Sequence, residues 1–213
     1  MPDRFDVGRL EAARTAADLS NEYDRIADSY DSVLIDEHQW RAPEIIAGIA
    51  AWLLPRSARI LDAACGTGLV GASLKRFGFT DVHGLDMSRG MLAVSERKQA
   101  YRTLANAALG GPLPYRSGEF DAVTISGAFT PNHAPPESLN ELVRATRPGG
   151  YVIFSLRSDE PPRGFAAAIG ALTASGRWVL FKQGAEFQSM PLVEPRVRTR
   201  LHVYEIADAH SKK

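Results

Sequence analysis

Cysteine is nearly absent from this chain of 213 residues, because Cys65 is the only one. A single cysteine excludes an internal disulfide and any metal site built from several cysteines, so we expect no metal ion. Such sparing use of cysteine is typical of proteins that work in a reducing compartment. We therefore expect a cytoplasmic location.

Long apolar runs are also lacking. No stretch approaches the roughly 18 consecutive apolar residues that a membrane-spanning helix needs. The first four residues lead into polar sequence and are not followed by the apolar segment of a secretory signal. The sequence therefore predicts no membrane partner.

An excess of charge of one sign is the third absence. The chain carries 25 basic and 25 acidic residues, so no overall field attracts nucleic acid, and the sequence gives no strong signal for a nucleic-acid partner. Apolar residues make up 45% of the chain, and its length suits one compact α/β domain. The sequence does not specify an oligomeric state.

The stretch that most restricts the function is residues 58–71, which read Ala-Arg-Ile-Leu-Asp-Ala-Ala-Cys-Gly-Thr-Gly-Leu-Val-Gly. Its apolar beginning predicts a buried strand, and Gly66 and Gly68 predict a tight turn that opens a helix. Because glycine has no Cβ, a ligand can lie against the backbone there, beside the unpaired N–H groups of the helix. The turn is therefore predicted to bind a ligand.

The charge beside this turn separates two classes of ligand. Gly66, Gly68 and Gly71 match the spacing of dinucleotide-binding turns, which hold a pyrophosphate. Asp62, four residues before Gly66, would place negative charge beside that anion, whereas a cationic ligand gains from it. S-adenosylmethionine has no phosphate and carries a sulfonium and an ammonium, so it is the favoured ligand, bound to Asp62 directly or through water. The alternative is that Asp62 orients the loop by accepting its backbone N–H groups.

A second acid stands at the end of the next apolar run. Asp86 follows Gly68 by 18 residues, which is the length of one helix and a returning strand. At this place in dinucleotide-binding folds, a carboxylate accepts the ribose hydroxyls of an adenosine, and we expect Asp86 to do the same. The alternative is an α/β domain whose glycines only make a tight turn and whose acids only cap helices.

Together these motifs resemble a known enzyme family. Ile-Leu-Asp-Ala-Ala-Cys-Gly-Thr-Gly followed by Gly-Leu-Asp-Met-Ser resembles the class I S-adenosylmethionine-dependent methyltransferases. Phe-Asp-Ala-Val at 120–123 and Pro-Gly-Gly at 148–150 are similar to the family's entries into its fourth and fifth strands. The resemblance implies a Rossmann-like α/β fold, with a seven-stranded, mostly parallel sheet, helices on both faces and a C-terminal antiparallel strand. It also implies S-adenosyl-L-methionine as the cofactor.

An N-terminal segment extends the resemblance. Residues 23–31, Tyr-Asp-x-x-Ala-x-x-Tyr-Asp, resemble a helix that lies over the cofactor as a lid in many small-molecule methyltransferases. We therefore expect residues 1–57 to form lid helices and residues 58–213 to form the cofactor-binding core. Tyr23 is interpreted as a core aromatic, whereas Tyr30 is a candidate for the site.

Further residues are candidates for the cofactor site. Arg41, near the start of a helix predicted over residues 38–54, is a candidate for the methionine carboxylate, with a solvated side chain as the alternative. Family members commonly place an acid after the third strand to accept the adenine amino group, but residues 103–111 contain none. Adenine is then left to the backbone near Ala108 and Leu109 or to Asn106. The complete predicted set is Tyr30, Arg41, Asp62, Ala63, Cys65, Gly66, Gly68, Asp86, Met87, Ala108, Leu109 and Ser126.

The reacting groups are expected in residues 129–136, because ligands of parallel sheets bind beyond the carboxyl ends of the strands. His133 is the candidate general base, since imidazole ordinarily titrates near neutrality. The alternative is a histidine that only hydrogen-bonds the loop.

The predicted function is methyl transfer from S-adenosylmethionine to a small-molecule acceptor, because no recognition domain is appended. The methylated atom stays open. The alternatives are a non-catalytic cofactor-binding regulatory module, a protein methyltransferase and a nicotinamide-dependent oxidoreductase.

Overall fold

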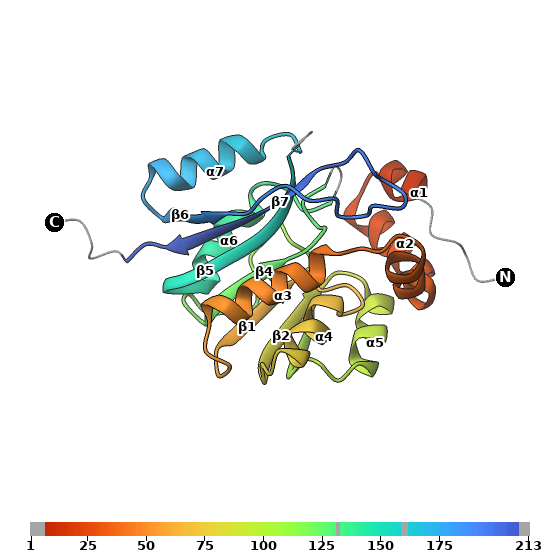
Figure 1. Ribbon diagram of the computed structural model, residues 1–213, viewed down its shortest axis with the longest axis horizontal. Helices are drawn as coiled ribbons and strands as arrows, with labels where there is room; N and C mark the ends of the chain where they lie inside the picture. The colour runs from red at the N-terminus through yellow and green to blue at the C-terminus, as the bar shows by residue number, and fades with distance from the viewer. Residues whose placement is uncertain (1–6, 131–132, 159–161, 209–213) are drawn as a thin grey trace.

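The computed structural model describes residues 7–130, 133–158 and 162–208 (Figure 1). The beginning of the predicted lid segment, residues 1–6, and residues 131–132 of the predicted acceptor loop lie outside the described residues. The helices are α1 (Val7–Ala12), α2 (Ala16–Asp31), the π-helix η1 (Ser32–Glu37), α3 (Ala42–Leu53), α4 (Leu69–Arg76), α5 (Arg89–Arg97), α6 (Ser138–Ala145) and α7 (Phe165–Ala174). The strands are β1 (Arg59–Ala63), β2 (Asp81–Asp86), β3 (Thr103–Asn106), β4 (Phe120–Ile125), β5 (Thr146–Arg157), β6 (Trp178–Gln183) and β7 (Thr199–Ile206).

The strands form one seven-stranded sheet in the order β3-β2-β1-β4-β5-β7-β6. Strands β1 to β5 are paired in parallel, and β7 runs antiparallel between β5 and β6. The predicted Rossmann-like fold is therefore confirmed. The order of the strands reverses between β1 and β4, and such a switch point is where open α/β sheets bind their ligands.

Alternating side chains of the strands fill two cores, one on each face of the sheet. On one face Ile60 packs with residues of α3 and α4, such as Ile46 and Leu74. On the other face Leu61 packs with residues of α6, such as Leu142. Since successive residues of a strand point to opposite faces, the apolar run of β1 is buried on both sides. Because both faces of β1 are covered, only its carboxyl end can approach a ligand.

The region between the lid and the core differs from the sequence prediction. The helix predicted from residue 38 begins at Ala42, because Gln39 has a φ of 54° and Pro43 occupies the first turn. The π-helix η1 precedes it and was not predicted. Helix α2 begins at a capping box, in which Thr15 and Asp18 each bond the other's backbone N–H.

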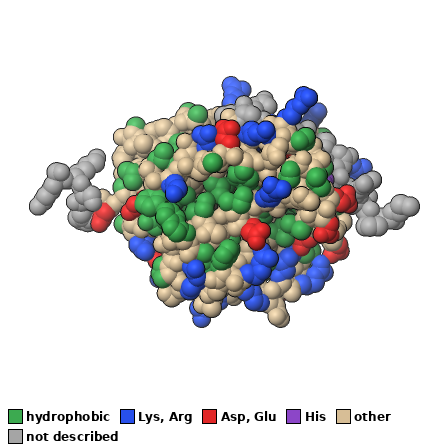
Figure 2. Space-filling view, in the orientation of Figure 1, with side chains coloured by type: hydrophobic (Ala, Val, Ile, Leu, Met, Phe, Trp, Pro, Cys, Tyr) green, Lys and Arg blue, Asp and Glu red, His purple; other side chains and the backbone are tan. Residues whose placement is uncertain are grey.

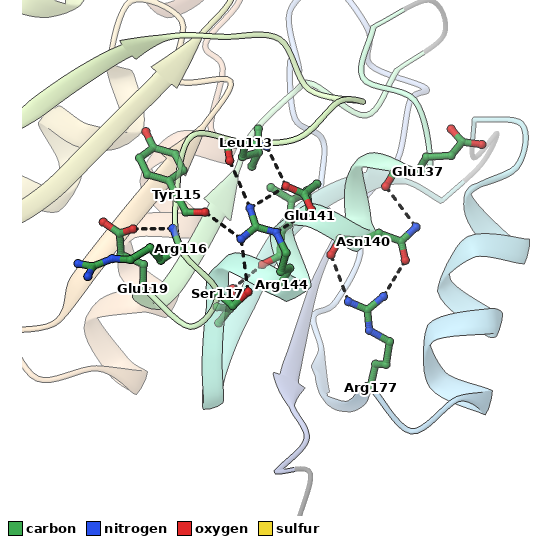
Figure 3. Close-up of polar contacts among 12 residues, drawn as sticks. Leu113, Tyr115, Arg116, Ser117, Glu119, Glu137, Asn140, Glu141, Arg144 and Arg177 are labelled. Atoms are coloured by element: carbon green, nitrogen blue, oxygen red, sulfur yellow. Dashed lines mark hydrogen bonds and ion pairs between the residues drawn. The ribbon is translucent and has the colours of Figure 1, made fainter.

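A half-buried arginine, Arg144, fixes the chain segment that leads into β4 (Figure 3). Arg144 on α6 donates hydrogen bonds to the carbonyls of Tyr115 and Leu113, at 2.8 and 3.3 Å. Glu141, one turn earlier, holds the same guanidinium through two 2.7 Å bonds and accepts the N–H of Leu113. This guanidinium lowers the pKa of Glu141 below its usual range, because its hydrogen bonds favour the carboxylate.

Apolar side chains gather on the surface where α3 meets the edge strand β6, and Figure 2 shows them on this face of the molecule. Trp52 is 62% exposed, and the ring of Phe181 lies 6.3 Å from it. Among the described helices, none is both long enough and apolar enough to span a membrane.

Candidate functional site

A cavity of about 910 Å³ lies at the carboxyl ends of β2 and β4, beside the turn that follows β1. Residues 12–16 and the inner side of α2 form its roof, and the segments after β2, β3 and β4 form its walls. Eight residues predicted for the site line it, namely Tyr30, Gly66, Asp86, Met87, Ala108, Leu109, Ser126 and His133. Arg41, Asp62, Ala63, Cys65 and Gly68 do not line it, although the structure describes all five.

The two glycines of the turn serve different purposes. Gly66 has a φ of 53°, and a Cβ built on it would meet no atom within 4 Å, because the residue borders open cavity. Gly68 has a φ of 90°, and its Cβ would come within 2.7 Å of Ser95 Oγ and 3.0 Å of the Tyr101 ring. Gly66 therefore leaves space for a ligand, whereas Gly68 allows the turn to pack against α5 and the segment after it.

Asp62 lies behind the turn and is fully buried, with 1% of its surface exposed. Tyr101 donates a 2.6 Å hydrogen bond to its Oδ2, and Thr124 donates a 3.1 Å bond to its Oδ1. Burial raises the pKa of Asp62 to about 7, although these two hydrogen bonds act in the opposite direction. Tyr101 also accepts the N–H of Gly71, so the carboxyl group orients the turn through Tyr101.

Asp86 faces the cavity from the end of β2. Its Oδ2 accepts the N–H of Gly66 and its Oδ1 accepts the N–H of Ser88, both at 2.8 Å. A carboxylate accepts about four hydrogen bonds in all, so Asp86 keeps acceptor capacity for a ligand. Burial raises the pKa of Asp86, while hydrogen bonds from the backbone of Ser88, Gly66 and Met87 lower it.

The two acids of the repeated Tyr-Asp motif attach α2 to the core. Asp24 accepts hydrogen bonds from the Ser88 hydroxyl at 2.5 Å and from the N–H of Gly90 at 2.7 Å. Asp31 accepts the hydroxyl of Thr67 at 2.5 Å and pairs with Lys98 at 2.6 Å. The roof is therefore joined both to the glycine turn and to the start of α5.

The two tyrosines of that motif, seven residues apart, face the cavity. Tyr23 Oη lies 2.7 Å from Nε2 of His133, and Nδ1 of the same ring lies 2.8 Å from Thr130 Oγ1. The rings of Tyr23 and Tyr30 meet edge to face, with centroids 6.1 Å apart. The structure therefore places Tyr23, interpreted from the sequence as a core aromatic, on the cavity wall beside the predicted base.

Three other candidate residues differ in their relation to the cavity. Ser126 has a buried hydroxyl that faces the cavity without a hydrogen-bond partner among the described residues. Asn106 donates its amide to the carbonyls of Asp86 and Met87, at 3.1 and 2.8 Å, and thereby fixes that loop. The side chain of Arg41 is exposed, and its backbone N–H binds the carbonyl of Ser189.

Sequence reasoning missed part of the site. Arg14, Thr15 and Leu19 line the cavity, and the Thr15–Asp18 capping pattern was the available signal that a helix begins there. No sequence pattern indicated that Tyr101 contacts Asp62, because the two residues are 39 positions apart in the chain. Among the described residues, no group of three or more His, Cys, Asp or Glu side chains is arranged to hold a metal ion.

Known proteins resemble this chain in both sequence and fold. The family model "Methyltransferase domain" matches residues 61–154. Human methyltransferase-like protein 27 is 38% identical over 181 residues, covering 80% of this chain and 73% of the human protein. The demethylmenaquinone methyltransferase of Beutenbergia cavernae is 38% identical over 112 residues, covering 53% of this chain and 46% of that protein.

Solved structures resemble the whole fold at low sequence identity. A TehB-like SAM-dependent methyltransferase from Corynebacterium glutamicum superposes with a TM-score of 0.64 at 17% identity, over 87% of this chain and 98% of the other. A putative methyltransferase from Haloferax volcanii, solved in complex with the Trm112 methyltransferase activator, gives a TM-score of 0.65 at 19% identity, over 88% and 98%. The identity with the human relative, the domain match and the shared fold show that this chain belongs to the class I S-adenosylmethionine-dependent methyltransferases and takes S-adenosylmethionine as its cofactor.

Proposed function

We propose that this enzyme methylates a small molecule that shares the 910 Å³ cavity with the cofactor. The volume is the observation that carries the proposal, since it stands at the upper end of the ~300–1,000 Å³ of ordinary ligand sites. Such a cavity has room for a nucleoside and a second compound of similar size. Its roof, formed by residues 12–16 and α2, covers the cavity, which favours a small acceptor over the protein-methyltransferase alternative.

The residues that line one end of the cavity fit the cofactor. Asp86 keeps lone pairs for the ribose hydroxyls, Gly66 leaves open space beside the turn, and Ser126 offers an unpartnered hydroxyl. We assign adenine to the wall made by Met87, Ala108 and Leu109, because the Asn106 amide is committed to the loop. When bound, the cofactor supplies an electrophilic methyl group on a sulfonium.

The other predicted residues act indirectly in this proposal. Asp62 and Ala63 end β1, Cys65 and Gly68 belong to the turn itself, and we propose that all four support the shape of the turn. Arg41 has an exposed side chain away from the cavity, so we do not assign the methionine carboxylate to it. The lid role of residues 1–57 is supported by the position of α2 over the cavity, and His133, at the cavity wall, is the proposed general base.

Relatives guide the choice of acceptor. Proteins named demethylmenaquinone methyltransferase and ubiquinone biosynthesis O-methyltransferase are 32–39% identical to parts of this chain, which favours a small organic acceptor. Motifs across residues 23–155 also resemble the methyltransferase-like protein of the Williams-Beuren syndrome chromosomal region, and no acceptor can be transferred from that resemblance.

Two measurements test the proposal. At 100 times its Kd, S-adenosylhomocysteine should stabilise the protein by ~2.7 kcal/mol and raise the Tm by roughly 5–10 °C, whereas NAD should not. Labelled methyl groups should then pass from S-adenosylmethionine to one component of a metabolite extract. Transfer to the proteins of a parallel whole-cell lysate, with none to the metabolite extract, would contradict the proposed acceptor class.

A further inference from the structure

Three side chains from two segments form a continuous hydrogen-bonded chain at the cavity. Tyr23 comes from α2 in the roof, whereas Thr130 and His133 come from the segment after β4. The Tyr23 hydroxyl meets Nε2 of His133 at 2.7 Å, and Thr130 Oγ1 meets Nδ1 at 2.8 Å. The Tyr23 and His133 rings also pack edge to face, with centroids 5.8 Å apart. Both ring nitrogens of the imidazole are thus held in place.

The chemistry of the two partners sets the position of the proton on the imidazole. A phenol is a far stronger hydrogen-bond donor than an aliphatic alcohol, and the alcohol oxygen is the better acceptor. Tyr23 therefore donates to Nε2, and Nδ1–H donates to Thr130. Burial raises the pKa of the Tyr23 hydroxyl well above its ordinary value, so Tyr23 keeps the proton that this arrangement needs.

We propose that Tyr23, His133 and Thr130 form a proton relay, in which Tyr23 is the group that touches the acceptor. The Tyr23 oxygen takes the proton of the acceptor X–H bond while its own proton passes to Nε2 of His133. The electron pair of X–H would thereby be released to bond the methyl carbon, while the carbon–sulfur bond breaks with its electron pair going to sulfur, which leaves the neutral thioether S-adenosylhomocysteine. His133 ends as an imidazolium whose Nδ1–H is still held by Thr130, which acts as a positioning residue. This inference rests on the proposed function.

The relay also indicates the class of acceptor. A relay that removes a proton serves only an acceptor that carries one and becomes a better nucleophile when it loses it. We therefore infer a phenolic or enolic hydroxyl as the methylated group, rather than a tertiary amine or a thioether, which has no proton to give.

The first test reads the proton position directly. Nitrogen-15 NMR of histidine-labelled protein distinguishes the two neutral tautomers, and the loss of signals in His133→Asn assigns His133 among the five histidines. We expect Nδ1–H in the wild type and a shift toward the Nε2–H tautomer in Tyr23→Phe. Tyr115→Phe removes a buried hydroxyl that has no partner in the described part of the chain and does not line the cavity, so it should leave the tautomer unchanged.

The second test uses turnover with a panel of phenols, enols and amines and labelled S-adenosylmethionine. Tyr23→Phe and His133→Asn should each lower methyl transfer by about 10²–10⁴-fold. The double variant should be no slower than the slower single variant, because the two residues act as one unit. Affinity for S-adenosylhomocysteine should fall far less than turnover.

The two tests separate the relay from the function on which it rests. A wild-type imidazole that carries its proton on Nε2, or a tautomer that Tyr23→Phe leaves unchanged, overturns the relay even if methyl transfer is found. Fully additive losses in the double variant also overturn it. Failure to bind S-adenosylhomocysteine overturns the proposed function instead.

Discussion

Asp24 on α2 accepts hydrogen bonds from both the Ser88 hydroxyl and the N–H of Gly90, at 2.5 and 2.7 Å. Ser88 is also the N-cap of α5, and its hydroxyl accepts the N–H of Met91. A Cβ on Gly90 would come within 2.8 Å of the Asp24 Cα, so the two helices meet closely. One carboxylate therefore links the roof of the cavity to the wall that carries Asp86 and Met87.

The first prediction concerns this link. Asp24→Ala should release α2, because each hydrogen bond to a charged group contributes about 1.5–3 kcal/mol. We expect faster amide exchange over residues 16–31 and weaker binding of S-adenosylhomocysteine, with the sheet unaffected. Asp28→Ala, which removes a surface ion pair with Arg97 on the same helix, should change exchange little. Equal effects of both variants would contradict the assigned role of Asp24.

The second prediction concerns the pH dependence of stability. Because the folded-state pKa of Asp62 is about 7 against an ordinary 3.8, the folded protein holds a proton between these values that the unfolded chain has released. Stability contributed by this group should therefore fall as pH rises toward 7, by about 1.4 kcal/mol per pH unit, and then level off.

Asp62→Asn should remove this slope. Urea unfolding of the cofactor-free protein at pH 5, 6, 7 and 8 measures the slope. Between pH 5 and 7, the free energy of unfolding of the variant should rise relative to that of the wild type by roughly 2–3 kcal/mol. Asp36→Asn, which changes an exposed carboxylate on η1, is the matched control. Parallel curves for the wild type and Asp62→Asn would show that the buried carboxyl is not protonated in this range.

The third prediction separates ligand binding from folding at the glycine turn. Gly66→Ala should lower the free energy of unfolding by about 1–2 kcal/mol, because alanine is disfavoured at a φ of 53°. Its new methyl group enters open cavity, so the variant should fold but lose at least about tenfold in affinity for S-adenosylhomocysteine, or ~1.4 kcal/mol. Calorimetry measures the affinity. Gly170→Ala on α7, where a Cβ also meets nothing, should leave the affinity unchanged.

The fourth prediction concerns the segment in Figure 3. Arg144→Met should destabilise the protein by about 2–3 kcal/mol, since it leaves the carbonyls of Leu113 and Tyr115 and the Glu141 carboxylate without their donor. The loss should be greatest near neutral pH and shrink as pH falls through the lowered pKa of Glu141, where the carboxylate is protonated. Thermal melts at several pH values measure it. Arg177→Met, an exposed arginine bonded to Asn140, should cost much less.

Much of the core was predictable because its signals are local. Glycine at fixed spacing after an apolar strand, and an acid at the end of the next strand, are short-range patterns that the turn and Asp86 follow. The contacts that complete the site are not local. Asp62 meets Tyr101 and Tyr23 meets His133 only after the chain has folded, over separations of 39 and 110 residues. The sequence carries no period or spacing from which such a pair can be inferred.

The roof of the cavity is attached unequally along its two sides. On one side, Asp24 and Asp31 hold α2 through four contacts with the core, whereas the Tyr23–His133 bond joins it to the segment after β4. A helix fastened in this way tilts most easily about its carboxylate side. Breaking the Tyr23–His133 bond would therefore loosen the roof at the segment after β4, while the carboxylate contacts of α2 with the core persist.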